Sequence, residues 1–353
     1  MTAPALRVAI VGATGAVGRE MVTILEERRF PVGKLRLFAS ARSAGEVLEF
    51  RGEDIAIEDL STRDRNESFD LALFSAGSEL SAQHAADFVE AGAWVVDNSS
   101  AFRESIDCPL IVPEINSHSL HDSKRRIIAN PNCTTIALVQ SLFPLLQLQR
   151  IKRVVVSTYQ SVSGAGKKGM NELEGQVRNL LNGIPPDVDV FPARIAFNCL
   201  PLIGDPDEDG VTVEERKVMT ETARILGDQN LKVMVTAVRV PVFIGHSLAV
   251  HVEFEGDLAP EAAAQAMADH PGVLVTDRES FLATPTTADI AGEDMVLVGR
   301  LRRDRTVEHG LAYWVVSDNL RKGAALNAIQ IAESLIQRDL IDGVAIGATK
   351  GNA

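Results

Sequence analysis

Residues 7–18 read RVAIVGATGAVG, an apolar run that leads directly into three evenly spaced glycines, Gly12, Gly15 and Gly18. The pattern predicts a buried strand, a tight turn and the beginning of a helix. Glycines at such a turn let the backbone approach a pyrophosphate, whose charge is stabilised by N–H groups at the helix N-terminus. The spacing departs from G-x-G-x-x-G, so a turn that binds no ligand is the alternative. The position between the first strand and the first helix favours dinucleotide binding.

Strand–helix alternation continues through the first third of the chain. Val17–Arg28 carries apolar residues at helical spacing. Short apolar runs predict further strands at Leu35–Phe38, Leu71–Phe74, Trp94–Asp97 and Ile127–Ala129. This alternation predicts a parallel sheet with helices on both faces.

From about Ile151 the expected strands become longer and more alternating, which indicates a mixed or antiparallel sheet with one covered face. They are Arg153–Tyr159, Lys232–Val240, Ser247–Phe254, Met295–Leu301 and Gly310–Val316, and the helices between them are Asn171–Leu181, Thr212–Leu226 and Pro260–His270. The fold class is therefore α/β: a Rossmann-type dinucleotide-binding domain and an α+β domain with a mixed β-sheet.

A strong helical period returns at Gly323–Gln337, and we expect this last helix to pack back onto the first domain. A chain of 353 residues exceeds what one hydrophobic core usually organises. We expect residues 1–131 to form the dinucleotide-binding domain, completed by the C-terminal helix at 319–353, and residues 132–318 to form the second domain.

Composition limits the classes of partner. The net charge of 35 − 48 = −13 argues against non-specific binding to nucleic acid. The chain lacks a run of about 18 apolar residues, which a transmembrane helix needs, and Met1–Leu6 lacks the features of a signal peptide. We therefore expect a cytoplasmic protein with neither a nucleic-acid nor a membrane partner.

The second strand is followed by Ser40-Ala-Arg42-Ser43, with no acidic residue before Glu46. An acid at this point would favour NAD, whereas basic and hydroxyl groups accommodate the 2′-phosphate of NADP. The cluster therefore favours NADP(H). A polar loop with one solvated arginine is the alternative.

Cys133 has the sequence setting of a nucleophile. It lies in Asn130-Pro-Asn-Cys133-Thr-Thr, between a predicted strand and an apolar helix, Ile136–Leu146. Because Pro131 does not fit a helix interior, the helix should begin within a residue or two of Cys133. A thiol at a helix N-terminus is expected to have a lowered pKa and a larger thiolate fraction. A buried cysteine without chemistry is the alternative.

The other two cysteines, Cys108 and Cys199, lack such a setting, and we interpret them as ordinary buried residues. The three cysteines also lack the spacing of a metal site, so no metal is expected. Among seven histidines, His246 has the best context for a general base. It follows Gly245 in a predicted loop between two strands, and a pKa near neutrality suits proton transfer. A structural histidine is about as frequent at this spacing.

Together these segments resemble the aspartate-semialdehyde dehydrogenase family over nearly the whole chain. The motifs that carry the resemblance are Gly12–Gly18, Ser99–Arg103, Asn130–Thr135, Tyr159–Gly166, Glu214–Lys217, Arg239-Val-Pro and Gly245-His246-Ser247. The family implies an NADP-binding domain, a catalytic and dimerisation domain, and a homodimer or homotetramer. It also implies the reductive dephosphorylation of L-aspartyl 4-phosphate to L-aspartate 4-semialdehyde, which serves lysine, threonine and methionine biosynthesis.

The resemblance assigns catalytic roles to residues at matching positions. Cys133 is similar to the nucleophile that forms a thioester, His246 to its acid/base partner, and Gln160 to the residue that orients the intermediate. The implied substrate contacts are Gln160, Asn132, Glu214 at the α-ammonium and Arg239 at the α-carboxylate, with Arg103 and Lys217 at the phosphate. The implied cofactor contacts are Gly12, Thr14, Gly15, Ala16, Val17, Ser40, Arg42, Ser43, Ser163, Gly164 and Asn319.

Some of these residues have simpler interpretations. Thr212-Val-Glu-Glu215 predicts a capping box, so acids at this helix start can be structural. Glu214 and Lys217 lie three apart and could form an exposed ion pair. Two alternative functions also stay open. One is N-acetyl-γ-glutamyl-phosphate reductase, whose substrate has an acylated nitrogen and needs no carboxylate at Glu214; the other is a non-catalytic NADP-binding paralogue.

Overall fold

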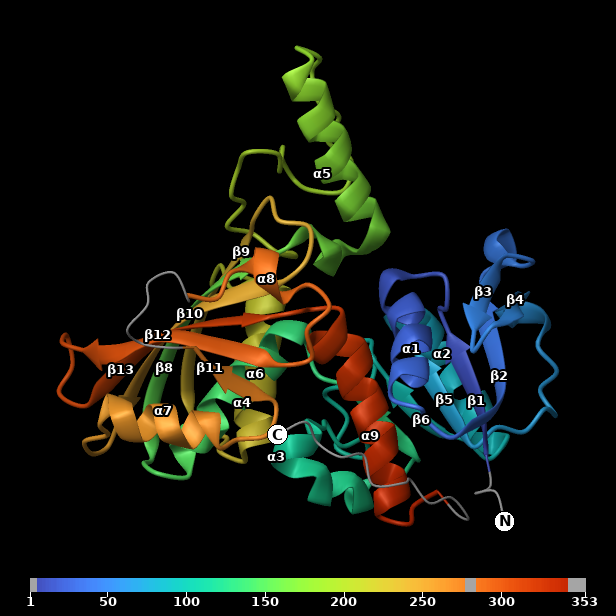
Figure 1. The fold of residues 1–353 in the computed structure, drawn as a ribbon, viewed down its shortest axis with the longest axis horizontal. Helices are drawn as coiled ribbons and strands as arrows, with labels where there is room; N and C mark the ends of the chain where they lie inside the picture. Colours follow the sequence, from blue (N-terminus) through green and yellow to red (C-terminus); the bar gives the residue numbers. More distant parts are fainter. Residues whose placement is uncertain (1–4, 277–283, 342–353) are drawn as a thin grey trace. The chain divides into compact units, whose positions relative to one another are not determined.

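The computed structural model describes residues 5–276 and 284–341. The chain divides into two compact units, whose described residues are 5–131 with 324–341 in one unit and 132–276 with 284–323 in the other (Figure 1). Each unit has its own sheet, which confirms the predicted fold class. No helix in the part of the chain that the structure describes is long and apolar enough to cross a membrane.

The first unit contains a seven-stranded sheet in the order β3-β4-β2-β1-β5-β6-β7. Its strands are β1 (Leu6–Val11), β2 (Val32–Ala39), β3 (Val47–Phe50), β4 (Glu53–Asp59), β5 (Leu71–Phe74), β6 (Trp94–Asp97) and β7 (Ile127–Ala129). All neighbouring strands are parallel except β3 and β4. The strand order reverses beside β1, and in such sheets ligands bind at the carboxyl ends of the strands at that point.

Helices cover both faces of this sheet. They are α1 (Ala16–Glu27), α2 (Ser78–Glu90), the short α3 (Pro113–Asn116) and α9 (Leu326–Gln337). Leu37 and Leu73 share a core with α1 and α9. Because side chains alternate across a strand, their neighbours Phe38 and Phe74 point to the other face, where both contact Phe88 of α2.

The last helix packs onto the first unit, as the sequence predicted. Ile331 and Leu335 of α9 are fully buried in the same core as Ile24 of α1. Arg28, the C-cap of α1, forms a bidentate ion pair with Glu333, in which both N–O distances are 2.7 Å. The C-terminal segment therefore completes the core of the dinucleotide-type sheet.

The second unit contains a six-stranded mixed sheet in the order β11-β12-β13-β10-β8-β9. Its strands are β8 (Ile151–Gln160), β9 (Lys232–Arg239), β10 (His246–Phe254), β11 (Val273–Val275), β12 (Val296–Asp304) and β13 (Gly310–Ser317). The pairs β8/β9 and β11/β12 are parallel and the other pairs are antiparallel.

One face of this sheet is covered by three helices. The helices of the unit are α4 (Cys133–Leu146), α5 (Gly166–Leu181), α6 (Val213–Leu226), α7 (Pro260–Ala268) and the short α8 (Thr287–Ile290). Leu138 of α4, Val218 of α6 and Met267 of α7 join Val156 and Val250 of the sheet in one core. The helix α5 instead packs on the chain that follows it, in a smaller cluster.

Two features of the first unit were not predicted. The strands β3 and β4 form a hairpin whose turn, Arg51-Gly52, has positive φ angles of 54° and 79°. Its strands, VLEF and EDIAIED, mix apolar and acidic residues and are mostly exposed or half-exposed, so they carry no long apolar run. The helix α2 was missed because its buried positions, Ser81, Ala85 and Phe88, include only one large apolar side chain.

The beginning of the last helix was also predicted wrongly. The expected helix began at Gly323, but α9 begins at Leu326. Arg321–Ala325 forms a π-helical turn before it. Such turns keep the helical spacing of apolar residues approximately, so a periodicity argument does not separate them from α-helix.

Leu335 tests how much α9 contributes to the first unit. We expect Leu335→Ala to lower the free energy of unfolding by about 2–5 kcal/mol, because it leaves a cavity in a closed core. The control is Leu80→Ala in α2, where the side chain is 38% exposed. Urea denaturation followed by Trp94 fluorescence, in a Trp314→Phe background, reports on the first unit. Equal losses in the two variants would contradict the packing described here.

Candidate active site

Three candidate side chains lie at one edge of the six-stranded sheet. Gln160 and Arg239 end the parallel strands β8 and β9 and are direct partners in the register. The antiparallel strand β10 begins at His246, next to Ser247, which pairs with Tyr159 of β8. Gln160, Arg239 and His246 are all buried, with exposures of 1%, 7% and 1%. The strand order itself therefore brings together an amide, a guanidinium and an imidazole.

Cys133 is the first residue of α4, as the position of Pro131 predicted. The side-chain oxygen of Asn132 caps this helix, accepting hydrogen bonds from the N–H groups of Thr134 at 2.9 Å and Thr135 at 3.2 Å. The half-buried thiol lies at the positive end of the helix dipole, which favours a thiolate. Gly323 packs against it, since a Cβ at Gly323 would lie 3.0 Å from the Cβ of Cys133.

The remaining cysteines differ from each other. Cys108 is buried, as expected, but Cys199 is exposed, so its interpretation as a buried residue was wrong. Cys199 follows Asn198 in a segment between α5 and α6, and its own N–H is held by the Asn198 side chain at 2.9 Å. A single cysteine in the sequence does not show whether its loop is buried or exposed, and here the loop is exposed.

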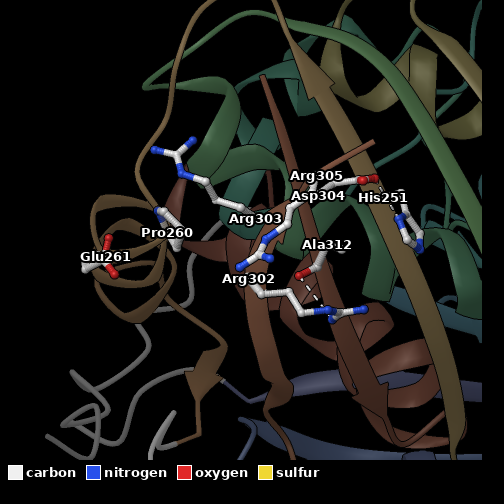
Figure 2. Close-up of a pocket in the computed structure, with 8 residues that line it drawn as sticks. All are labelled: His251, Pro260, Glu261, Arg302, Arg303, Asp304, Arg305 and Ala312. Carbon is white, nitrogen blue, oxygen red and sulfur yellow. Dashed lines mark hydrogen bonds and ion pairs between the residues drawn. The ribbon is translucent and has the colours of Figure 1, made fainter. Parts of the chain in front are cut away.

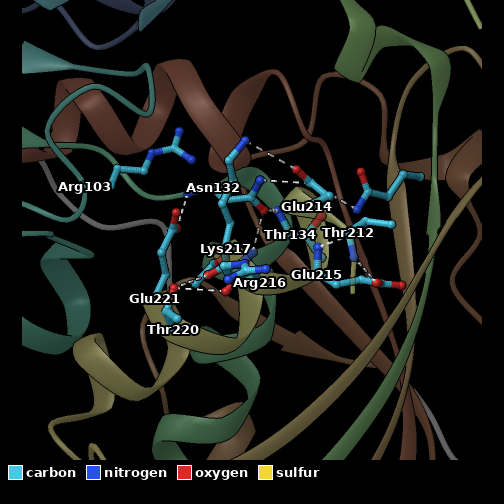
Figure 3. Close-up of polar contacts among 12 residues, drawn as sticks. Arg103, Asn132, Thr134, Thr212, Glu214, Glu215, Arg216, Lys217, Thr220 and Glu221 are labelled. Carbon is cyan, nitrogen blue, oxygen red and sulfur yellow. Dashed lines mark hydrogen bonds and ion pairs between the residues drawn. The ribbon is translucent and has the colours of Figure 1, made fainter. Parts of the chain in front are cut away.

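Glu214 is held by two side-chain amides. Its Oε1 accepts hydrogen bonds from Asn132 Nδ2 at 2.9 Å and Gln160 Nε2 at 3.3 Å. Lys217 lies 4.0 Å away on the next turn of α6 (Figure 3). The Glu214 side chain is only 13% exposed, so an exposed ion pair does not describe it. The capping box is confirmed as well, because Thr212 and Glu215 cap α6 reciprocally, which leaves Glu214 for other contacts.

Glu221 is a buried acid that sequence reasoning missed. Its Oε2 accepts the backbone N–H of Asn132 at 2.7 Å, directly before the candidate nucleophile. Glu221 lies seven residues after Glu214, or two turns along the same face of α6. That spacing was the available signal, but charged residues on one helix face are usually solvated.

Arg239 lies beside the negative groups of the site. Its Nη1 donates to the Ser161 carbonyl at 2.7 Å, and its guanidinium lies 6.0 Å from the ring centroid of Phe191. Burial lowers the pKa of Arg239, while the charges of Glu214 and Cys133 raise it. The same attraction acts in the other direction, so the guanidinium favours a thiolate at Cys133.

His246 differs in two respects from the sequence-based expectation. It is the first residue of a strand rather than a loop residue, and it is almost fully buried. Its pKa is lowered to about 3, mainly by burial and then by the charge of Arg239, against an opposing backbone interaction with Gly245. A pKa near neutrality was therefore wrong, and the imidazole is neutral at pH 7.

Asn319 lies shortly after β13, and both the oxygen and the nitrogen of its side-chain amide form hydrogen bonds with other residues. Its Oδ1 accepts the N–H of Gly245 at 2.9 Å and the hydroxyls of Ser161 and Ser163, each at 3.1 Å. Its Nδ2 donates to the Ser163 hydroxyl at 2.9 Å. The neighbouring Gly164 leaves room beside the site, because a Cβ there would lie 2.8 Å from Arg239 Nη1.

The glycine-rich loop of the first unit has the geometry of an anion site. Gly12 has a φ of +90°, and a Cβ there would lie 2.4 Å from the carbonyl oxygen of Ser75. Gly15 is the N-cap of α1, no side chain caps this helix start, and the first turn contains no acid. Thr14, Ala16 and Val17 belong to the same turn and helix start. This arrangement fits a pyrophosphate at the helix N-terminus.

The segment after β2 forms a short 3₁₀ turn, Ala41–Ser43, preceded by Ser40. Ser40 and Arg42 are exposed and Ser43 is buried. The first acid after this turn, Glu46, pairs with Arg19 at 3.3 Å. The exposed Arg42 and the Ser40 hydroxyl therefore lie after β2, where domains of this kind bind the adenosine ribose.

Arg103 belongs to the first unit and is fixed by backbone carbonyls. Its Nε donates to Asn130 and its Nη2 to Asn98, both at 2.9 Å. These carbonyls follow β7 and β6 directly. The side chain is thus held at the carboxyl edge of the first sheet, whereas Lys217 belongs to the second unit.

A wide cavity of the second unit is separate from these residues. It has a volume of about 700 Å³ and is lined by His251, Pro260, Glu261, Arg302, Arg303, Asp304, Arg305 and Ala312 (Figure 2). His251 and Asp304 pair across it at 3.1 Å, and Arg303 pairs with Asp257. None of the candidate catalytic residues lines it.

Two family models match the chain. Residues 7–123 match the semialdehyde dehydrogenase NAD binding domain, and residues 142–322 match the semialdehyde dehydrogenase dimerisation domain. Aspartate-semialdehyde dehydrogenase from Aquifex aeolicus is 49% identical over 337 residues, which is 95% of this chain and 99% of that protein.

The chain belongs to the aspartate-semialdehyde dehydrogenase family. Solved structures of aspartate semialdehyde dehydrogenase II from Vibrio cholerae, one of them complexed with ASA, are 46% identical, with a TM-score of 0.92. The alignment covers 95% of this chain and 99% of each of those chains. Membership in the aspartate-semialdehyde dehydrogenase family makes the chain an oxidoreductase, in agreement with the resemblance seen in its motifs.

Proposed function

We propose that the chain catalyses the NADPH-dependent conversion of L-aspartyl 4-phosphate to L-aspartate 4-semialdehyde, with Cys133 as the nucleophile. The observation that carries the proposal is the thiol at the N-terminus of α4, within the electrostatic reach of the buried Arg239. A helix dipole and a guanidinium both favour the thiolate, which is the reactive form. The solved relative in complex with ASA supports the substrate class.

The amino-acid part of the substrate would be recognised by opposite charges. Arg239 would bind the α-carboxylate, a group that matches the planar guanidinium. Glu214 would bind the α-ammonium, assisted by the amides of Asn132 and Gln160 that already hold its Oε1. An acylated nitrogen carries no charge, so the buried Glu214 favours aspartyl phosphate over N-acetyl-glutamyl phosphate.

The covalent steps balance without a metal. The Cys133 thiolate forms a C–S bond to the acyl carbon, the C–O bond to phosphate breaks, and phosphate leaves with that electron pair. Arg103 and Lys217 are proposed to bind the phosphate. Gln160 orients the resulting thioester, and backbone N–H groups at the start of α4 stabilise its oxygen. After reduction, the C–S bond breaks, the thiolate returns to Cys133, and His246 moves the proton at the substrate oxygen as the acid/base residue.

Bound NADPH would supply the hydride. Gly12, Thr14, Gly15, Ala16 and Val17 would hold its pyrophosphate at the start of α1, where the first turn contains no acid. Ser40, Arg42 and Ser43 would bind the 2′-phosphate. Ser163 and Gly164 would lie near the nicotinamide, with Asn319 acting through the Ser163 hydroxyl that it holds. In the cell, the product would serve lysine, threonine and methionine biosynthesis in the cytoplasm.

A homodimer is the assembly that we propose. The match to a dimerisation domain covers residues 142–322, which include the whole six-stranded sheet. The sheet face without helices carries Tyr159 and Trp314, whose ring centroids lie 5.3 Å apart, and Met234, which is 53% exposed. Exposed large apolar side chains on a sheet face fit a second copy of the chain.

Replacing the thiol tests the nucleophile. We expect phosphate-dependent NADPH formation from aspartate semialdehyde, followed by the near-ultraviolet absorbance of NADPH, to be abolished in Cys133→Ala. Cys199→Ala is the matched control, because Cys199 is exposed, and should keep its activity. Activity with N-acetyl-glutamate semialdehyde alone would identify the rival reductase. Cofactor binding with no turnover of either substrate would instead identify a non-catalytic paralogue.

Arg42 tests the cofactor preference. We expect Arg42→Ala to lower kcat/KM for NADP by about 10- to 100-fold, the loss expected for a hydrogen bond between charged groups. The same variant should change kcat/KM for NAD little, because NAD lacks the 2′-phosphate. Steady-state rates with each cofactor measure both values. An equal loss with NAD would show that Arg42 acts on the fold rather than on the phosphate.

Met234 tests the dimer face. We expect Met234→Asp to shift the protein from dimer toward monomer in light scattering at micromolar concentration, because a buried unpaired carboxylate is costly. Val47→Asp in the first unit is the control, with a similar exposure of 49% against 53%. A dimer that is equally stable in both variants would place the interface elsewhere.

A further inference from the structure

We propose that Glu221 is a positioning residue, which completes the cap of α4 from the neighbouring helix α6 and thereby fixes Cys133 relative to Glu214. This inference rests on the proposed function and deepens it, because Glu214 is the group proposed to bind the substrate ammonium. Glu221 acts through the backbone of Asn132 and does not contact the substrate.

The helix α4 contains only half of a capping box in its own sequence. The Asn132 side chain accepts the N–H of Thr135, the third helical residue, at 3.2 Å. In a complete box the third residue is Glu or Gln, and its side chain accepts the N–H of the N-cap residue in return. The Thr135 hydroxyl makes no hydrogen bond among the described residues, so it does not fill this role.

Glu221 of α6 supplies the missing half of the box. Its Oε2 accepts the N–H of Asn132 at 2.7 Å (Figure 3). The start of α6 shows the same pair of bonds within one helix, where Thr212 accepts the N–H of Glu215 at 3.3 Å and Glu215 accepts the N–H of Thr212 at 2.8 Å. The two caps are therefore equivalent, except that in α4 the carboxylate comes from a residue 89 positions away.

A cap that is completed from another helix also connects the two helices. Glu214 Oε1 accepts Asn132 Nδ2 at 2.9 Å, so α6 binds both the side chain and the backbone of the residue before Cys133. Glu214 and Glu221 lie on one face of α6, two turns apart. A cap within α4 would stabilise the start of this helix as well, but it would not hold Cys133 at a set distance from Glu214.

Burial makes the contact between Glu221 and Asn132 difficult to replace. The two residues are only 4% and 6% exposed. Without the carboxylate, the Asn132 N–H would lose its acceptor in a place that solvent hardly reaches, which is unfavourable. A charged acceptor also forms a shorter and stronger hydrogen bond than a neutral one. The backbone directly before Cys133 is therefore held in one position.

A set distance between Cys133 and Glu214 is important for the proposed reaction. The thiolate must reach the acyl carbon while Glu214 binds the ammonium of the same substrate molecule, and the two residues belong to different helices. A misplacement of reacting groups by about 1 Å can lower a rate by about 100-fold. A small reagent that contacts only the thiol does not depend on this distance.

Hydrogen–deuterium exchange tests the cap without any substrate. We expect faster exchange in the peptide that contains Asn132 for Glu221→Met, which has no oxygen, and unchanged exchange for Glu221→Gln, whose amide oxygen can accept the same N–H. Glu333→Met is the matched control, because Glu333 is a buried glutamate of the first unit that binds Arg28. If Glu221→Met does not fold, Glu221→Asp replaces it, since its carboxylate is one methylene shorter. Unchanged exchange in the shortened or apolar variant would overturn the proposed cap.

Two reactions of Cys133 test the positioning role. We expect Glu221→Met to lower kcat/KM for aspartate semialdehyde by about 10- to 100-fold, mainly through kcat, as for a small misplacement of the reacting groups. In a Cys199→Ala background, the rate at which iodoacetamide alkylates Cys133 should stay close to that of the parent protein. Glu221→Gln should retain both rates, because it keeps the acceptor.

The outcomes separate this inference from the proposed function. If turnover and alkylation fall in parallel in Glu221→Met, Glu221 acts on the thiol itself or on the fold, and the positioning role is overturned. If Glu221→Gln loses turnover as Glu221→Met does, the charge rather than the hydrogen bond is required, which also overturns it. A parent protein that does not turn over aspartate semialdehyde would refute the proposed function, whereas the exchange data would still decide whether Glu221 caps α4.

Discussion

The position of the α4 N-terminus in the second unit depends on Asn132, whose side chain and backbone N–H form hydrogen bonds in three directions. Its side-chain oxygen caps α4, its amide nitrogen binds Glu214, and its backbone N–H binds Glu221. These contacts fix the first turn of α4 to Glu214 and Glu221, which lie two turns apart on α6. Cys133 directly follows Asn132 in the sequence. Gln160 and Arg239 lie at the ends of the paired strands β8 and β9, so the strand register fixes the positions of their backbones. The positions of the reactive groups therefore follow from ordinary helix capping and strand pairing.

Charge explains why so many ionisable groups tolerate burial here. The chain has a net charge of −13, but the edge of the second sheet combines Glu214 with Arg239 and Lys217. Buried charges are stable only when they are paired or hydrogen-bonded. The amides of Asn132 and Gln160 donate hydrogen bonds to Glu214, and the Ser161 carbonyl accepts one from Arg239. The same arrangement suits a substrate that carries both an ammonium and a carboxylate group.

Sequence patterns predicted the fold class and most elements, because buried strands and amphipathic helices leave periodic signals. They also identified Cys133 at its helix start and the glycine turn, where local rules decide the geometry. They missed the largely exposed β3–β4 hairpin and α2, which bury few large apolar side chains. Glu221 and Ser161 were missed for another reason. Their contacts join segments about 90 residues apart, and a helical spacing such as that of Glu221 does not indicate which distant residue is the partner.

The chain leaves the first unit after Pro131 and returns to it only at Ala324. The second unit is thus an insertion within the first, and α9 closes a core that α1 began about 300 residues earlier. On the ribosome, the inserted unit has been synthesised in full before the last helix of its host emerges. The apolar side of α1 must wait for that helix, so the N-terminal domain, although translated first, can complete its folding only last.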